Sequence, residues 1–254
     1  MTDSLTYIVF SMSGKRSAHE RFPEVIAAAV RVFTRDGYRA ARMSDVARAA
    51  GLSEAALYRY VEGKEGLFVL AIRHALLLEE MPTEGGPGED FPLKPPPLAQ
   101  MILQVRDFVA AEVPFGSLAA ALAGPSLDDP VAELEAVMRE LFTLEKQTRE
   151  AADMIERSAR ELPELADLLN TGLRSPVLAA LTTYLDSRAK AGTLRATPDT
   201  AATARLVLET LTWFARHRHS DPYGAAIPDG LAEETAVDAL IHALVPASFL
   251  GGRP

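Results

Sequence analysis

The 254-residue sequence contains no cysteine, which excludes disulfides, thiol-based redox sensing and metal sites built on cysteine sulfur. It also lacks an apolar run of the roughly 18 residues that a membrane-spanning helix needs. The apolar segment Leu5–Phe10 has no basic region before it and no clear cleavage site after it. We therefore interpret residues 1–18 as a disordered tail, not a signal peptide, with Met12 as an alternative start. A cytoplasmic protein is expected.

Acidic side chains outnumber basic ones, and the formal net charge of the whole sequence is −9. The charge is spread unevenly, because the segment from Lys15 to Ala75 holds eleven basic and seven acidic side chains. That segment carries a net +4 and the remainder of the chain a net −13. Such an asymmetry directs the attraction for phosphate to one part of the chain and keeps the other part off DNA.

Residues 43–68 have the pattern of short helices joined by a tight turn. Gly51 permits the positive φ at which a helix can end sharply, and the hydroxyl of Ser53 can cap the helix that follows. Two short helices joined in this way form a helix-turn-helix, whose second helix can enter the major groove of DNA. The predicted elements are a helix over Ser44–Ala50, a turn at Gly51–Ser53, a helix over Glu54–Tyr60 and a further helix from Lys64.

The two short helices have apolar inner faces. Val46, Ala47 and Ala50 form a narrow stripe on the first helix, and Leu57 is the inner anchor of the second. A surface of small residues, two phenols and a guanidinium suits a DNA groove better than plain solvent. The side chains expected to point outward from the second helix are Ala55, Ala56, Tyr58, Arg59 and Tyr60.

Residues 20–75 resemble the TetR family of transcriptional regulators. The residues that carry the resemblance are Phe22, Ala28, Ala29, Phe33, Gly37, Tyr38, Val46, Ala47, Ala50, Gly51, Leu52, Ser53, Leu57, Tyr58, Arg59, Tyr60, Val61, Lys64, Glu65, Leu67 and Phe68. The resemblance implies a homodimer whose C-terminal helical domain binds a small molecule and thereby controls affinity for a DNA operator. It also implies that the helix from Lys64 joins the two domains.

Two positions depart from the family pattern. Arg42 stands where family members commonly carry a serine or threonine that caps the first short helix and touches a phosphate. An arginine can still reach a phosphate, but the cap must then come from another residue, for which Ser44 is the candidate. Gly66 weakens the first turn of the helix that follows the helix-turn-helix.

The candidate DNA contacts have several alternative roles. Lys64 is expected to contact a phosphate at a helix N-terminus, and Arg59 can hold either a guanine edge or a phosphate. Tyr58 could instead be a half-buried support, Arg59 a solvated charge, and Glu54 either a helix stabiliser or a cytosine reader. The full candidate set is Arg42, Ser44, Ser53, Glu54, Ala55, Ala56, Tyr58, Arg59, Tyr60 and Lys64.

The fold class is expected to be all-α, with an N-terminal helix-turn-helix three-helix DNA-binding domain followed by a larger helical ligand-binding and dimerisation domain. The predicted division is a tail at 1–18, the DNA-binding domain at 19–80, a Pro/Gly-rich linker at 81–97, the larger domain at 98–247 and a tail at 248–254. Residues 81–97 could alternatively lie over a ligand entrance. Helices are predicted over Phe22–Asp36, Lys64–Glu80, Leu98–Val113, Ser117–Ala123, Pro130–Ala159, Glu164–Gly172, Pro176–Ala191, Asp199–His217 and Asp229–Leu244.

The predicted homodimer uses two C-terminal helices from each subunit, at about 176–191 and 199–217. Two recognition helices about 34–36 Å apart could then read successive major grooves. The apolar seams proposed for this interface are Leu178, Leu181 and Leu185 on one helix and Ala204, Leu208 and Leu211 on the other. These seams could instead face the subunit's own core. If one of the two helices is not part of the interface, the helix predicted over Asp229–Leu244 is the candidate to replace it.

A ligand cavity between the long helices could be lined by aromatic and methionine side chains, which suit a flat or flexible apolar ligand. Ordinary core packing predicts the same residues, and Arg157 could anchor an anionic group or form a surface ion pair. The candidates are Phe108, Phe115, Met138, Phe142, Met154, Arg157, Tyr184 and Trp213. The Arg216–His219 run is interpreted as a cationic helix end, because residues two apart on a helix diverge and cannot share a metal.

The sequence contains no Gly-rich phosphate loop, metal-ligand set or nucleophile elbow, so no enzyme, cofactor, metal or catalytic residue is predicted. The expected function is that of a ligand-responsive repressor, with a DNA operator, a second copy of the chain and a small-molecule effector as partners. Transcriptional activation on the same fold and a helical ligand-binding adaptor without sequence-specific DNA binding are the alternatives. The effector, the operator sequence and the target genes are left open.

Overall fold

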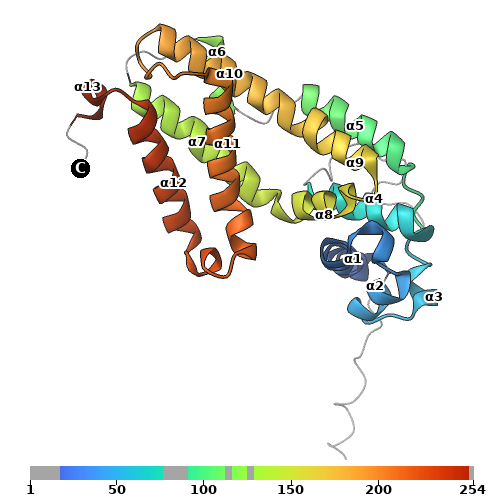
Figure 1. Cartoon of the computed structure of the whole chain (residues 1–254). Coiled ribbons are helices and arrows are strands. Elements are labelled where there is room, and N and C mark those ends of the chain that lie inside the picture. Colours follow the sequence, from blue (N-terminus) through green and yellow to red (C-terminus); the bar gives the residue numbers. More distant parts are fainter. Residues whose placement is uncertain (1–17, 77–90, 112–115, 125–128, 252–254) are drawn as a thin grey trace, which may run out of the picture.

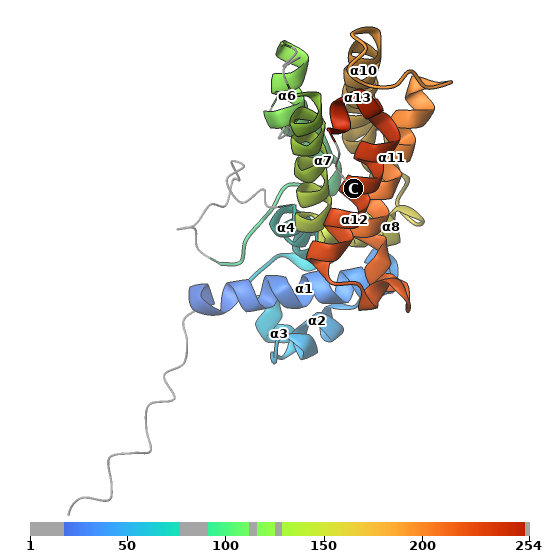
Figure 2. The same ribbon diagram turned by 90° about the vertical axis from the view of Figure 1, so that its left-hand side faces the viewer.

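The computed structural model describes residues 18–76, 91–111, 116–124 and 129–251 (Figure 1). Within these ranges every regular element is a helix, and one isolated parallel bridge joins Val61 to Leu93. The all-α prediction is therefore confirmed for the part of the chain that the structure covers. The N-terminal helices lie together at one end of the molecule, and the C-terminal helices extend away from them (Figures 1 and 2).

The N-terminal end of the molecule consists of the predicted helix-turn-helix and its flanking helices. The first helix is longer than predicted and includes a break at Gly37, whose φ of 76° and ψ of 173° are not helical. The second short helix is shorter than predicted, because Tyr58–Tyr60 continue as turns in place of regular helix. The bounds are α1 Ala18–Ala40, α2 Met43–Ala49, α3 Glu54–Leu57 and α4 Gly63–Ala75.

The remaining helices match most of the predicted positions, but the helix predicted to reach His217 ends at Ala215, and a short helix over Ala247–Leu250 extends into the predicted tail. The helix predicted over Pro130–Ala159 is divided at Thr148, whose hydroxyl donates to the carbonyl of Leu144 at 2.8 Å. The segment predicted over Glu164–Gly172 is an α-helix that continues as a π-helix. The bounds are α5 Leu98–Ala111, α6 Gly116–Ala123, α7 Pro130–Gln147, α8 Arg149–Ala159, α9 Pro163–Asp167, η1 Leu168–Arg174, α10 Ser175–Lys190, α11 Thr200–Ala215, η2 His217–Ser220, η3 Gly224–Ala226, α12 Asp229–Leu244 and α13 Ala247–Leu250.

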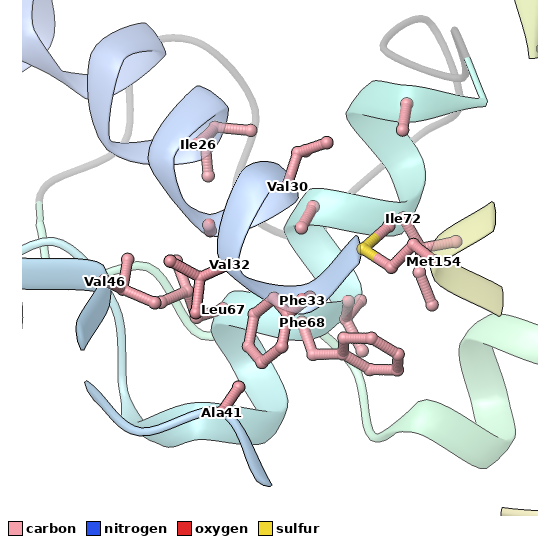
Figure 3. Packing of buried hydrophobic residues seen from close by; sticks show 14 of the residues in the cluster. Ile26, Val30, Val32, Phe33, Ala41, Val46, Leu67, Phe68, Ile72 and Met154 are labelled. Atoms are coloured by element: carbon pink, nitrogen blue, oxygen red, sulfur yellow. The ribbon is translucent and has the colours of Figure 1, made fainter. Parts of the chain in front are cut away.

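Buried apolar side chains form two clusters. The first joins α1, α2 and α4 to α5, α8 and α9, so it includes helices from both sides of residues 81–97. Within it the rings of Phe33 and Phe68 meet edge to face at 4.9 Å, and Met154 of α8 lies beside Ile72 of α4 (Figure 3). The second cluster lies among α6, α7, α10, α11 and α12. The DNA-binding end therefore shares one continuous core with α5 and α8.

Candidate nucleic-acid interface

The turn between α2 and α3 has the geometry that the sequence predicts. Gly51 has a φ of 66°, and the amide of Leu52 donates back to the carbonyl of Ala47 at 2.8 Å, which closes the end of α2. The hydroxyl of Ser53 accepts a hydrogen bond from the amide of Ala56 at 3.2 Å and so caps α3. Leu57 is fully buried and holds α3 against the core. The second short helix is therefore fixed at its N-terminal end.

The outer face of α3 carries most of the side chains predicted to point outward. Tyr58 is 45 % exposed, Glu54, Ala55 and Arg59 are also exposed, and Ala56 is half-buried. These groups offer a phenol, a carboxylate and a guanidinium on one surface of a short helix. Direct reading of bases requires hydrogen-bonding and apolar groups presented in this way.

The outward placement predicted for Tyr60 is wrong. Only 6 % of this residue is exposed, and its ring packs edge to face against Phe91 at a centroid distance of 5.3 Å. The reason is that regular helix ends at Leu57, and the amides of Arg59 and Tyr60 bond to carbonyls three residues earlier. These tighter turns rotate Tyr60 toward the core.

The start of α2 differs slightly from the prediction. The helix begins at Met43, and neither Arg42 at the N-cap position nor Ser44 forms a side-chain cap there. The carbonyl of Arg42 instead accepts from the amides of Asp45 and Val46, at 3.0 and 3.2 Å. The Arg42 side chain is exposed, which is compatible with a phosphate contact.

Lys64 lies at the N-terminus of α4 but is not a fully solvated cation. Its ammonium donates to the carbonyl of Arg39 at 3.0 Å and lies 4.8 Å from the centre of the Tyr38 ring. Partial burial lowers the pKa of Lys64. Because an ammonium has three donors, the bond to Arg39 leaves hydrogens that can meet a phosphate. Lys64 thus also ties α4 to the end of α1.

Residues 25–71 match the family model described as bacterial regulatory proteins, tetR family. These residues are therefore a TetR-family DNA-binding domain. Among solved structures, a mutant of the HlyIIR protein is similar over 90 % of this chain and 99 % of its own, with 17 % identity and a TM-score of 0.51. A TetR-like transcriptional regulator from Rhodococcus sp. RHA1 is similar over 87 % of this chain and 93 % of its own, with 17 % identity and a TM-score of 0.50. At these identities the two structures show the fold alone.

No curated protein matches the sequence. TetR-family regulators are DNA-binding proteins without enzymatic activity, so the family match supports the expectation that this chain is not an enzyme. Within the ranges that the structure covers, no helix is long and apolar enough to cross a membrane. Over the same ranges, histidine and carboxylate side chains form no group of three that could hold a metal ion.

Helix α8 is attached directly to the DNA-binding end. The guanidinium of Arg157 donates to the carbonyl of Arg35 from Nη2 at 2.6 Å and from Nε at 3.1 Å. The hydroxyl of Ser158 accepts from the amide of Tyr38 at 3.1 Å. These bonds satisfy backbone groups where α1 is interrupted at Gly37, so the position of α1 depends on α8.

Two carboxylates of α8 contact a buried arginine at the C-terminal end of α11. Arg216 is only 3 % exposed, forms an ion pair with Glu156 and lies 3.7 Å from Asp153. Burial raises the pKa values of Glu145 on α7 and of Asp153, although the positive charge of Arg216 opposes both shifts. The Arg216–His219 run lies at the C-terminal end of α11, as the sequence predicts, with Arg216 at the C-cap position, but the Arg216 side chain is buried. Arg218 is also buried, at 1 % exposure, and its Nε donates to the carbonyl of Phe214 in the last turn of α11, as expected of a cationic helix end.

The predicted ligand-lining residues do not form a single group. Met138, Phe142 and Tyr184 are buried in the second cluster, whereas Met154 is buried in the first. Trp213 is 37 % exposed, and Arg157 is exposed at the contact with α1. Phe115 and the side chain of Phe108 lie outside the part of the chain that the structure describes. The sequence alone could not distinguish core positions from cavity-lining positions, because aromatic and methionine residues pack in a core as readily as they line a cavity.

The apolar seams predicted for the dimer face inward. Leu181, Leu185, Ala204, Leu208 and Leu211 are each at most 4 % exposed within the single subunit, and Leu178 is half-buried. The alternative, that these residues belong to the subunit's own core, is correct for the five buried ones. The exposed apolar side chains of α11 are instead Leu206, at 63 %, and Trp213, at 37 %.

Proposed function

We propose that this TetR-family protein is a transcriptional repressor that binds a palindromic DNA operator as a homodimer and leaves it when a small apolar or amphipathic effector binds. The observation that carries the proposal is the capped α3 with Tyr58 and Arg59 exposed on its outer face. The positive charge of residues 15–75, in a chain of net charge −9, adds a sequence-independent attraction for the phosphate backbone.

The proposed roles of the DNA-binding residues follow from their positions. Arg59 and Tyr58 are the base readers or thymine contacts, because both are exposed at the C-terminal end of α3. Arg42 and Lys64 are the phosphate contacts on either side of the helix-turn-helix. Phosphate contacts fix the register of a protein on DNA, whereas contacts with base edges supply sequence preference.

The proposed homodimer uses the exposed face of α11 together with α10. Leu206 and Trp213 are seven residues apart, so they lie on one face of α11 two turns apart. Large exposed apolar side chains grouped on one helix favour burial against another protein surface. A second copy of the chain would also double the number of recognition helices, as a palindromic operator requires.

The proposed effector acts on the region where α7, α8 and α11 meet. There α8 binds Arg216 of α11 through Glu156, and it binds the end of α1 through Arg157 and Ser158. An effector that displaces α8 would therefore also displace α1 and the recognition helix. If the effector prefers that displaced conformation, it shifts the population away from the one that fits DNA.

Selection of bound duplexes from a random DNA pool, repeated at several salt concentrations, tests the proposal. A palindrome with half-sites about one helical turn apart would support a dimeric sequence reader. Weak salt-sensitive binding without enrichment would refute it in favour of an adaptor that has lost sequence-specific DNA binding. Once an operator is known, its position relative to a promoter and a reporter assay distinguish repression from activation.

A further inference from the structure

The segment Phe91–Pro97 returns to the DNA-binding end and binds next to the recognition helix. The amide of Leu93 donates to the carbonyl of Tyr60 at 2.9 Å, and the amide of Glu62 donates to the carbonyl of Leu93 at 3.1 Å. The two bonds form the parallel bridge between Val61 and Leu93. We refer to residues 91–97 as the strap. The sequence predicts that this segment is part of a linker, but its backbone forms hydrogen bonds with the loop that follows α3.

Aromatic packing fixes the beginning of the strap. The Phe91 ring lies 5.3 Å from the ring of Tyr60, 5.4 Å from that of Phe22 and 4.8 Å from that of His19. Phe22 and His19 belong to α1, whereas Tyr60 ends the turns that follow α3. Phe91 therefore joins α1 to the C-terminal end of the recognition helix, and this contact explains why Tyr60 points inward.

The strap also accounts for the glycine at position 66. A Cβ atom at Gly66 would lie 3.0 Å from Cγ of Pro95 and 3.1 Å from Cγ2 of Val61. Both distances are shorter than ordinary van der Waals contacts, so any larger residue at this position would push Pro95 outward. The glycine that weakens α4 in the sequence is therefore the residue that lets the strap lie directly on α4.

The strap continues without interruption into α5, whose first turn is bonded to α4. The amide of Leu98 donates to a carboxylate oxygen of Glu65 at 2.8 Å, which satisfies a donor at the N-terminus of α5. Met101 and Val105 of α5 are fully buried in the cluster that includes α1 and α8. The strap thus leads from a rigidly packed helix to the end of α3.

We propose that the strap positions the recognition helix for DNA reading, with Phe91 and Leu93 as its positioning residues; this inference rests on the proposed function. A helix of four residues, as α3 is, cannot maintain its own orientation, because isolated short helices are unstable. Ser53 and Leu57 hold its beginning and inner face, and the strap holds its end through the carbonyl of Tyr60. Reading base edges requires side chains to be placed to within roughly 0.5 Å, so loss of the strap contacts should reduce sequence preference.

The test compares Phe91→Ala with Lys94→Ala in the full-length protein. Lys94 lies in the same strap, but its ion pair with Glu62 at 3.0 Å is exposed on both sides, so its removal should have little effect. Affinity is measured for the duplex selected by the wild type and for a scrambled duplex of equal length. Phe91→Ala should weaken binding to the selected duplex by about tenfold, a change of about 1.4 kcal/mol, and leave the scrambled duplex unaffected. Phe91→Leu should restore part of the loss, and Lys94→Ala should equal the wild type.

Hydrogen exchange and a second variant separate positioning from unfolding. In Phe91→Ala, the amides of Glu62 and Leu93 should exchange faster while those inside α1 stay protected. Gly66→Ala should press on Pro95 of the strap and on its bridge partner Val61, although alanine otherwise favours a helix, so reduced sequence preference in this variant reports a disturbed contact between the strap and the residues after α3. Normal affinity for the selected duplex in both variants, each still folded, would overturn the inference. Failure of the wild type to prefer any sequence would instead overturn the proposed function.

Discussion

The guanidinium of Arg157 on α8 and the backbone carbonyl of Arg35 on α1 form a direct connection between the larger helical part of the molecule and α1. Nη2 of Arg157 lies 2.6 Å from the carbonyl oxygen of Arg35, and its Cγ lies 3.3 Å from the position that a Cβ atom at Gly37 would occupy. The residues are 122 positions apart in the sequence. A residue that the sequence presents as a possible ligand anchor thus serves to hold the interrupted end of α1.

Arg157→Ala should lower the free energy of unfolding by about 1 kcal/mol, because a carbonyl at the end of α1 loses a charged donor. Arg160→Ala is the matched control, since Arg160 is an exposed arginine that follows the same helix. The free energy of unfolding of both variants is measured by urea titration with circular dichroism as the signal. The slope of this free energy against urea concentration is compared with that of the wild type. Equal midpoints for the two variants would mean that the Arg157 bonds contribute no net stability.

Lys64→Ala should weaken binding to all DNA sequences to a similar extent and reduce the slope of log affinity against log salt by about one unit. The reason is that the variant makes one phosphate contact fewer and therefore releases one counterion fewer when it binds DNA. The ammonium also donates to the carbonyl of Arg39, so the free energy of unfolding must be measured in parallel. Lys64→Arg keeps the charge and should retain most of the slope. An unchanged slope in Lys64→Ala would remove this residue from the phosphate contacts.

The local chemistry of the helix-turn-helix could be predicted from the sequence because each signal acts within a few residues. Gly51 adopts a positive φ, Ser53 caps α3 and Leu57 is buried, all for reasons visible in the sequence. Tyr60 was placed on the wrong side because its orientation depends on where α3 ends and on packing against Phe91, which is 31 positions away. Short-range patterns do not encode such a contact.

The positions of the larger helices along the sequence could be predicted, but the sequence did not reveal which side of each helix is buried within the subunit. Proline and glycine mark most of the breaks, yet an apolar stripe does not reveal whether it meets the same subunit or another one. Leu211 and Leu206 illustrate this on α11, since the first is fully buried and the second is 63 % exposed. The buried Arg216 was missed for a related reason, because its partners Glu156 and Asp153 come from a different helix.

Leu206→Arg should convert the proposed dimer into a monomer, because a charge on the exposed face of α11 cannot be buried against a second copy without a partner. Leu231→Arg is the matched control on α12, where the leucine is 54 % exposed. Sedimentation velocity measures the mass of both variants, and operator binding should fall with loss of the dimer. If Leu231→Arg dissociates the protein and Leu206→Arg does not, α12 replaces α11 in the proposed interface.

Glu145→Gln tests the polar region between α7 and α11 through the pH dependence of stability. Burial raises the pKa of Glu145 above its ordinary value of 4.5, so the folded state prefers the neutral acid. Below pH 4.5 the carboxyl is neutral in both the folded and the unfolded state, and its ionisation gives no penalty. As the pH rises through the raised pKa, the folded state must ionise a poorly hydrated carboxyl, and the wild type loses stability relative to the glutamine variant.

The unfolding free energy of Glu145→Gln minus that of the wild type should therefore become more favourable between pH 4.5 and pH 7. The comparison cancels the other carboxylates, including Asp229, whose pKa is lowered chiefly by its bond with Lys146 and whose contribution to stability is lost at low pH. Glu150→Gln, an exposed substitution on α8, should give a difference that stays flat over the same range. A difference that instead falls with rising pH would mean that attraction between the Glu145 carboxylate and Arg216 outweighs the effect of burial.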